Sequence, residues 1–407
     1  MKTKLPLFSA YGVELEYMIV NKDDLSVVPI SDKLIHDVSG TFQNEVEFEK
    51  IAWSNELVLH VIELKTNGPA KELKPLTHYF QHEVQKINGL LEKYHAKLLP
   101  TGAHPWMDPF KEAKLWPHDY NIIYETYHKI FDCRGHGWCN LQSVHLNLPF
   151  ANDNEFAKLH TAIRLILPII PALSASTPII DGNLTGLLDT RLEFYRLNQQ
   201  KIPSITGDVI PEVILSEQEY NDKILQKMYQ EISCYDPDKV LQEEWLNSRG
   251  AIARFDRNTI EIRIIDTQEC PEADLGIVSL IVAVLKKLVA EKWQPLAKQM
   301  DWSSSRLNSI FLNTIKNGMN SAIDNDYGHI FGMKPGECTA RELWQHIFNQ
   351  VSDEVDNAEI LQAIIKQGNL AERITSSIKN NASPERIEQV YDHLARCLQT
   401  GKLFQPL

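Results

Sequence analysis

The sequence predicts an α+β fold in which a curved antiparallel sheet has helices on its back and a polar, concave front. Three segments predict the sheet: residues 12–19 (GVELEYMI), 143–148 (SVHLNL) and 258–265 (NTIEIRII). In each segment aliphatic and polar residues alternate, which is typical of a strand with one buried and one polar face. Antiparallel sheets commonly combine such faces, because one side packs on the core and the other meets solvent or ligand.

The pattern becomes helical toward the end of the chain. Apolar residues recur at spacings of three and four in residues 284–293, 357–368 and 384–398, as on the buried stripe of an amphipathic helix. We therefore expect a mixed domain over residues 1–285 and a mostly helical C-terminal part over residues 286–407 that packs on it.

The polar faces of the three predicted strands carry acidic, histidine and arginine side chains that could bind a metal or a phosphate. The first strand presents Glu14 and Glu16, the second His145 and the third Glu261 followed by Arg263. Their opposite faces are aliphatic, so these polar residues all belong to the front of the predicted sheet.

A fourth segment, residues 56–66 (ELVLHVIELKT), is ambiguous. Glu56, His60 and Glu63 would align on one side of a helix, as in a helical metal site. The β-branched residues Val58 and Val61 favour a strand instead. In a strand Glu56 and Glu63 point to opposite faces, so both can serve one site only if a bulge or bend intervenes.

Composition narrows the possible functions. The 407 residues include 41 Lys and Arg against 54 Asp and Glu, a net charge of −13, which argues against nucleic acid as a partner. The longest apolar runs, residues 165–173 and 275–285, are shorter than the roughly 20 residues of a membrane span. The N-terminus has too short an apolar stretch for a signal peptide. We expect a cytoplasmic protein with no membrane partner and with its six scattered cysteines reduced.

The acids on the predicted front favour a hard divalent cation. Mg²⁺, or Mn²⁺ in its place, prefers oxygen ligands and is often shared between carboxylates and phosphates. The candidate ligands are Glu14, Glu16, Glu63, His145 and Glu261. The alternative for any one of these acids is a solvated strand face without a metal.

Cationic side chains supply the complementary half of a phosphate site. Lys65, Arg254 and Arg263 lie beside the acids in the sequence, while Arg134 and Arg191 lie in other loops. Arginine forks suit phosphate and carboxylate groups, although each arginine alone could equally form a surface ion pair. Acids and cations together fit metal-assisted phosphoryl transfer. His104, before Pro105, is either a hydrogen-bonded loop histidine or a substrate contact.

Six motifs in order resemble one family. They are GVELEYMIV, NELVLHVIELKTNGP, TGAHPW, LQSVHLNLPF, LSASTPIIDG and RFDRNTIEIRIIDTQECP, spread over roughly residues 10 to 285. Together they resemble the type-2 glutamate–cysteine ligase, or carboxylate–amine ligase, family, which has a glutamine synthetase-like fold.

The resemblance implies an ATP-dependent ligase that phosphorylates a substrate carboxylate, glutamate first, for attack by an amine such as cysteine. It implies metal ligation by Glu14, Glu16, Glu63, His145 and Glu261. Glu63, Glu261 and Arg263 would be catalytic, and phosphate would contact Arg263, Arg254 and Lys65. The residues expected to contact the substrates are Glu56, near the amine, and His104, Arg134 and Arg191. The expected partners are small amino acids, and a homo-oligomer is compatible with the helical C-terminal part.

Three alternatives stay open at this point. One is a related ligase that joins another acid or amine. The second is a metal-dependent phosphohydrolase, which the same carboxylates would suit. The third is a non-catalytic protein that binds nucleotides or amino acids on a ligase scaffold.

Overall fold

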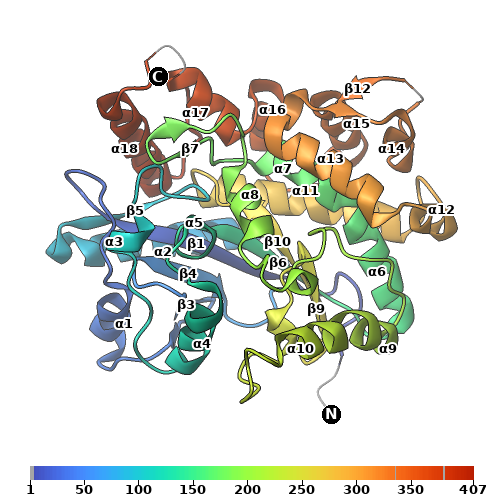
Figure 1. Ribbon diagram of the computed structural model, residues 1–407. Coiled ribbons are helices and arrows are strands. Elements are labelled where there is room, and N and C mark those ends of the chain that lie inside the picture. Colours follow the sequence, from blue (N-terminus) through green and yellow to red (C-terminus); the bar gives the residue numbers. More distant parts are fainter. Residues whose placement is uncertain (1–3, 335, 379–380) are drawn as a thin grey trace.

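The computed structural model describes residues 4–334, 336–378 and 381–407 (Figure 1). Its centre is an eight-stranded sheet with the order β2-β3-β4-β1-β6-β10-β9, to which β5 adds by pairing with β1. All of its pairs are antiparallel. The strands are β1 Gly12–Asn21, β2 Glu45–Glu47, β3 Ile51–Asn55, β4 Val61–Thr66, β5 Ala96–Leu99, β6 Ser143–Pro149, β9 Ala251–Arg254 and β10 Thr259–Asp266. Two small two-stranded sheets, β7 Ile179–Ile180 with β8 Asn183–Leu184 and β11 Ala322–Ile323 with β12 Cys338–Thr339, lie outside this sheet.

The predicted alternation of faces determines how the sheet packs. The three predicted strands are β1, β6 and β10, which are neighbours in the sheet. Val13 and Leu15 of β1, Leu146 of β6 and Ile260 of β10 are fully buried. Burying such side chains removes apolar surface from water, which stabilises the sheet against the layer behind it.

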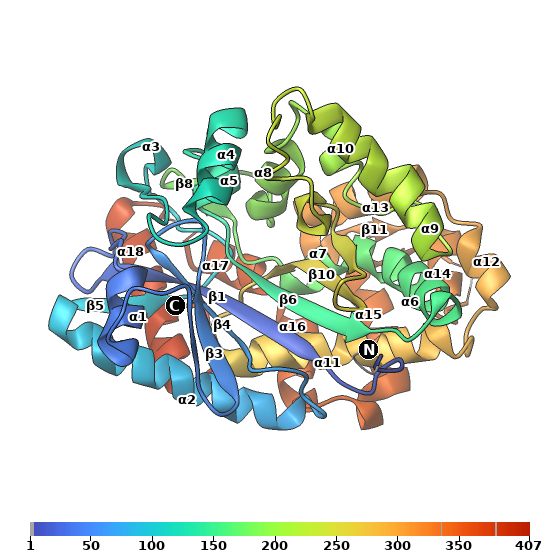
Figure 2. The same ribbon diagram turned by 90° about the horizontal axis from the view of Figure 1, so that it is seen from below.

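Helices cover the apolar side of the sheet. In Figure 2 the long helices α2 and α11 run along one side of it, and α4, α5 and α10 lie on the other side. The helices are α1 Ser31–Ser39, α2 Lys74–Leu91, α3 Pro109–Glu112, α4 Asn121–Phe131, α5 His136–Cys139, α6 Asp153–Ile166, α7 Ile170–Ser174, α8 Thr190–Leu197, α9 Glu217–Tyr220, α10 Gln226–Ile232, α11 Pro271–Val289, α12 Leu296–Met300, α13 Ser304–Asn317, α14 Asn325–Ile330, α15 Ala340–Val351, α16 Ala358–Gln367, α17 Leu370–Ile378 and α18 Pro384–Thr400. The α+β fold and the helical C-terminal segments are therefore confirmed.

The C-terminal helices share the core of the rest of the chain. Residue 285, the expected boundary, lies inside α11. One apolar cluster contains residues of the sheet together with residues of α13, α15 and α16, and a second joins β1 to α17 and α18. The part after residue 285 thus packs on the sheet without an apolar core of its own in the described chain.

The expectation of one strand over residues 56–66 is wrong. Only Val61–Thr66 forms strand β4; the preceding residues form a turn that connects it to β3. Val58 makes an isolated bridge to Leu115 there, and the buried His60 bonds the Cys139 carbonyl through Nε2 at 2.9 Å. The turn, rather than a bulge within a strand, sets the direction of Glu56.

Among the described residues, one helical segment, Asp153–Ser174, is apolar and long enough to cross a membrane by length and composition. Of that window, 94% is buried inside the protein. Packing against the sheet and the C-terminal helices accounts for its apolar composition.

A substitution at Leu394 of α18 tests whether the C-terminal helices share one core with the sheet. Leu394 is fully buried in the same apolar cluster as Met18 and Val20, which lie on the strand that carries Glu14 and Glu16. Leu394→Ala should lower the free energy of unfolding by about 2–5 kcal/mol, because it leaves a cavity. Urea unfolding measures this change and should show one transition.

The exposed Arg396 on the same helix is the control, and Arg396→Ala should change stability by less than about 0.5 kcal/mol. Two separate transitions in the wild type, or a Leu394→Ala variant as stable as the wild type, would contradict the shared core.

Candidate active site

The register of the sheet brings the polar side chains of four strands together. Glu16 of β1 pairs with Glu63 of β4, and Glu14 lies between Lys65 of β4 and His145 of β6. One step along, Asn147 of β6 pairs with Glu261 of β10. This face lines a cavity of about 950 Å³.

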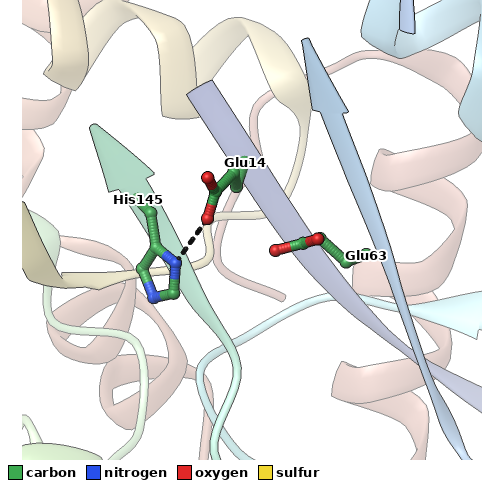
Figure 3. A group of neighbouring side chains, drawn as sticks. All are labelled: Glu14, Glu63 and His145. Carbon is green, nitrogen blue, oxygen red and sulfur yellow. Dashed lines mark hydrogen bonds and ion pairs between the residues drawn. The ribbon is translucent and has the colours of Figure 1, made fainter. Parts of the chain in front are cut away.

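Two overlapping groups of side chains on this face could each hold a metal ion. Glu14, Glu63 and His145 form the first, and Glu16, Glu56 and Glu63 form the second; within each group the potential ligand atoms lie within 4.8 Å of one another. Figure 3 shows Glu14 and Glu63 approaching from β1 and β4, with His145 bonded to Glu14 from β6. Glu63 is common to both groups.

Glu14 and His145 stabilise each other's charged forms. Nδ1 of His145 lies 2.8 Å from Oε2 of Glu14, and Nε2 lies 3.7 Å from Oε1 of Glu16. Burial alone would raise the pKa of Glu14, but the hydrogen bond and charge of His145, with Lys65, lower it to about 2. Burial would likewise lower the pKa of His145, yet Glu14 and Glu16 raise it to about 9.

Like charges surround Glu63 and Glu56, and these charges disfavour the ionised form of both carboxyl groups. Burial, and then the charge of Glu14, raises the pKa of Glu63 to about 7. Burial, with the charges of Glu16 and Glu63, also raises the pKa of Glu56. A divalent cation would relieve this repulsion, and its preferred ligands are carboxylate oxygens. The residues present therefore fit Mg²⁺ or Mn²⁺.

The three cations predicted to bind phosphate all line the cavity. Lys65 pairs with Glu45 of β2 at 2.5 Å and with Glu63 at 3.5 Å. Arg254 pairs with Asp256 at 3.1 Å. These cations face the same cavity as the acids, as a site for a metal-bound phosphate requires.

Glu261 lines the cavity but lies outside both potential metal groups. Its Oε1 forms an ion pair with Nε of Arg263 at 3.2 Å. Burial would lower the pKa of Arg263, but Tyr195 and Glu261 raise it, so the guanidinium stays charged. In this structure Glu261 pairs with Arg263, and its role as a metal ligand stays a prediction.

Three residues predicted to contact substrate are not among the residues that line the cavity. His104 is fully buried: Nε2 lies 2.7 Å from the Leu25 carbonyl, and Nδ1 accepts from the backbone N–H groups of Trp106 and Met107. Arg134 pairs with Asp132 at the surface, at 2.7 Å.

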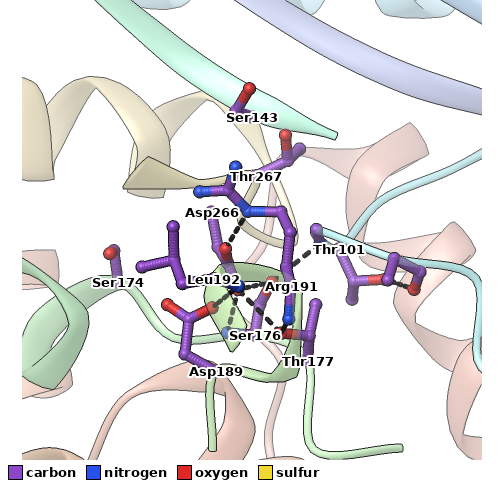
Figure 4. Close-up of polar contacts among 12 residues, drawn as sticks. Thr101, Ser143, Ser174, Ser176, Thr177, Asp189, Arg191, Leu192, Asp266 and Thr267 are labelled. Carbon is purple, nitrogen blue, oxygen red and sulfur yellow. Dashed lines mark hydrogen bonds and ion pairs between the residues drawn. The ribbon is translucent and has the colours of Figure 1, made fainter. Parts of the chain in front are cut away.

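Arg191 is buried in an ion pair with Asp266 at the end of β10 (Figure 4). Asp266 also accepts hydrogen bonds from the backbone N–H and the hydroxyl of Ser176 and from the hydroxyl of Thr177. The pair ties α8 to β10 and to the loop before β7. The sequence could not show this burial, because a buried arginine and a ligand-binding arginine look alike in a sequence.

Sequence reasoning missed the neutral donors and one acid of the site. Ser54 of β3 donates to Glu63, and Nδ2 of Asn147 donates to Glu14 at 3.1 Å. Ser143 contacts Glu16, and Glu45 holds Lys65. Alternation does place Asn147 and Ser143 on the polar face of the predicted 143–148 strand with His145, but it gives them no role. Ser54 and Glu45 lie on the short strands β2 and β3, which were not predicted.

The buried ion pair predicts a large cost of removing Arg191. Arg191→Met leaves Asp266 as an unpaired buried acid and should lower the free energy of unfolding by about 3–5 kcal/mol. The exposed pair of Arg134 with Asp132 supplies the control. Arg134→Ala should lower the free energy of unfolding by less than about 1 kcal/mol. Urea titration measures both. An Arg191→Met variant with wild-type stability would show that the pair does not support the fold.

The buried His104 predicts a pH dependence. Burial, opposed by the Leu25 hydrogen bond and reinforced by His136, lowers its pKa from 6.5 to about 4. Between these values the unfolded chain binds a proton that the folded chain does not, so stability falls as pH falls. The stability advantage of the wild type over His104→Gln should shrink by about 2 kcal/mol between pH 7.5 and 5. An advantage that stays constant with pH in urea titrations would refute a neutral buried His104.

Comparison with known proteins places this geometry in a family. The model of glutamate–cysteine ligase family 2 matches residues 10–393. An uncharacterised protein of Archaeoglobus fulgidus is 32% identical over 401 residues, which cover 97% of this chain and 99% of that protein. A protein of Bradyrhizobium diazoefficiens, provisionally named glutamate–cysteine ligase 2, is 24% identical over 92% of this chain and 81% of its own.

A solved structure confirms the fold. The glutamate–cysteine ligase of Francisella tularensis, solved in complex with AMP, superposes with a TM-score of 0.62 at 11% identity, over 96% of this chain and 89% of that one. The predicted glutamine synthetase-like fold is therefore confirmed, and the chain belongs to glutamate–cysteine ligase family 2.

Proposed function

We propose that this carboxylate–amine ligase uses ATP to activate a substrate carboxylate, with glutamate as the first candidate acid and cysteine as the first candidate amine. The observation that carries the proposal is one cavity lined by residues of both potential metal groups (Glu14, Glu56, Glu63 and His145) and by the cations Lys65, Arg254 and Arg263. Family membership supports the ligase chemistry, and the AMP in the Francisella protein supports a nucleotide.

The chemistry explains why such a cavity is needed. A carboxylate resists attack by an amine because its leaving group would be oxide. Transfer of the γ-phosphoryl group of ATP to a carboxylate oxygen releases ADP and gives an acyl phosphate. The amine then attacks the acyl carbon, loses a proton and expels phosphate, leaving an amide.

The chain's residues hold and orient the reacting groups. Glu14, Glu63 and His145 would hold one Mg²⁺ or Mn²⁺, and Glu16 and Glu56 with the shared Glu63 would hold another. The bound cation supplies charge neutralisation for the phosphates. Arg263, aimed by Glu261, and Lys65 would bind phosphate oxygens. These roles are positioning and electrostatic stabilisation, so no protein nucleophile is required.

A metal-dependent phosphohydrolase would use similar carboxylates. It would release phosphate from ATP at a rate indifferent to any amine. Family membership favours the ligase, and dependence on the amine separates the two functions directly.

ADP release tests the proposal. With Mg²⁺ and ATP, amino acids are supplied singly and in pairs, and one acid–amine pair should release ADP at least about 10-fold faster than either member alone. Chelation of divalent cations should abolish this release, because the carboxylates cannot bind phosphate without them. Release unaffected by any amine would favour the hydrolase, and release that survives exhaustive chelation would contradict the metal site.

Glu63→Gln is the matched variant within the same assay. It keeps the size of the side chain common to both groups but removes its charge, and should lower turnover by at least about 100-fold, or 2.7 kcal/mol. Glu49→Gln, at a side chain that is 85% exposed, should leave turnover unchanged. Equal turnover in the Glu63→Gln variant and the wild type would remove Glu63 from the site.

A further inference from the structure

We propose that Ser143 is a positioning residue that ties the two potential metal groups together through its hydroxyl. Its backbone N–H donates to Oε2 of Glu16 at 2.7 Å, and its Oγ lies 3.2 Å from the same oxygen. The same Oγ lies 2.9 Å from Nε2 of His145. The inference rests on the proposed function, because it concerns the metal ions of that site.

These contacts complete a continuous chain across the polar face. It runs from Glu14 through His145 and Ser143 to Glu16. Glu14 and His145 belong to the first metal group, and Glu16 belongs to the second. The two groups share Glu63, and His145 lies 3.7 Å from Glu16; the hydroxyl of Ser143 adds a hydrogen-bonded connection between them.

A hydroxyl is suited to this position. It can donate its one hydrogen to the Glu16 carboxylate while its lone pairs accept from Nε2 of His145. Without it, Nε2 of His145 would face Oε1 of Glu16 at 3.7 Å, beyond hydrogen-bond distance. Hydrogen-bond partners of ligand side chains fix their orientation, and their loss typically weakens metal binding 10- to 100-fold.

The surrounding structure holds Ser143 rigidly. It is the first residue of β6, is 6% exposed, and pairs with Asp266 at the far side of a register shift in β10. Thr267, which follows Asp266, donates its hydroxyl to the backbone carbonyl of Glu16 at 3.2 Å. Figure 4 shows the free end of the Arg191 guanidinium directed toward Ser143 and Thr267. The buried Asp266–Arg191 pair thus supports the strand end from which Ser143 reaches Glu16.

Mn²⁺ binding to the full chain without ATP tests the inference, with free Mn²⁺ measured by electron paramagnetic resonance. Ser143→Ala should bind Mn²⁺ about 10-fold more weakly than the wild type. Ser143→Thr keeps the hydroxyl and should stay within about 3-fold of the wild type. Ser279→Ala removes a buried hydroxyl from α11, where it contacts the Gly276 and Asp356 carbonyls, and should bind as the wild type does.

Urea unfolding of each variant separates positioning from loss of fold. The inference is overturned if Ser143→Ala binds Mn²⁺ as tightly as the wild type. It is also overturned if Ser143→Thr binds Mn²⁺ as weakly as Ser143→Ala while both variants unfold at the wild-type urea concentration. Where Ser143→Ala does not fold, Ser143→Cys replaces it: weaker binding than in Ser143→Thr supports the inference, and equal binding overturns it. A wild type that binds no Mn²⁺ refutes instead the metal site of the proposed function.

Discussion

The arrangement depends on one electrostatic constraint, the crowding of carboxylates on the polar face of a single sheet. Side-chain alternation and antiparallel register place Glu14, Glu16 and Glu63 on adjacent strands, and the turn after β3 adds Glu56. Like charges at such distances repel strongly where water is scarce. The folded chain offsets part of the repulsion with His145 and Lys65. The repulsion that remains raises the pKa values of Glu56 and Glu63, and a divalent cation would remove it.

Burial on the apolar side of the sheet offsets the repulsion among the acids on its polar face. The same strands that carry the acids bury aliphatic residues against α2, α11 and the C-terminal helices. That burial stabilises the folded chain without any contribution from the acids. Neutral donors then fix the acids: Ser54 on Glu63, Asn147 on Glu14 and Ser143 on Glu16. Hydrogen-bonded carboxylates lose rotamer freedom before a ligand arrives, so less ordering remains for binding to impose.

Local patterns predicted the parts of this structure that depend on local physics. Alternation identified β1, β6 and β10 and the facing of Glu14, His145 and Glu261, because a strand has a period of two. It could not give strand order, which depends on long-range pairing, nor the turn that brings Glu56 to Glu63.

The arginines and histidines show a second limit of sequence reasoning. Arg191 and Arg263 have the same chemistry, yet one is buried against Asp266 and the other lines the cavity. His104 and His145 likewise differ in their surroundings: backbone groups satisfy the first, and carboxylates surround the second. Burial and partners separate these roles, and neither is visible in the order of residues.

The central claim is that the cavity activates a carboxylate by phosphorylation, and oxygen transfer measures this step directly. With an ¹⁸O-labelled carboxylate substrate, glutamate first, and the amine that supports ADP release, an acyl phosphate passes one substrate oxygen to the released phosphate. Mass spectrometry of that phosphate should show one ¹⁸O atom for each amide formed. Unlabelled phosphate, released equally fast with or without the amine, would mean that water attacks the γ-phosphoryl group and would contradict the account.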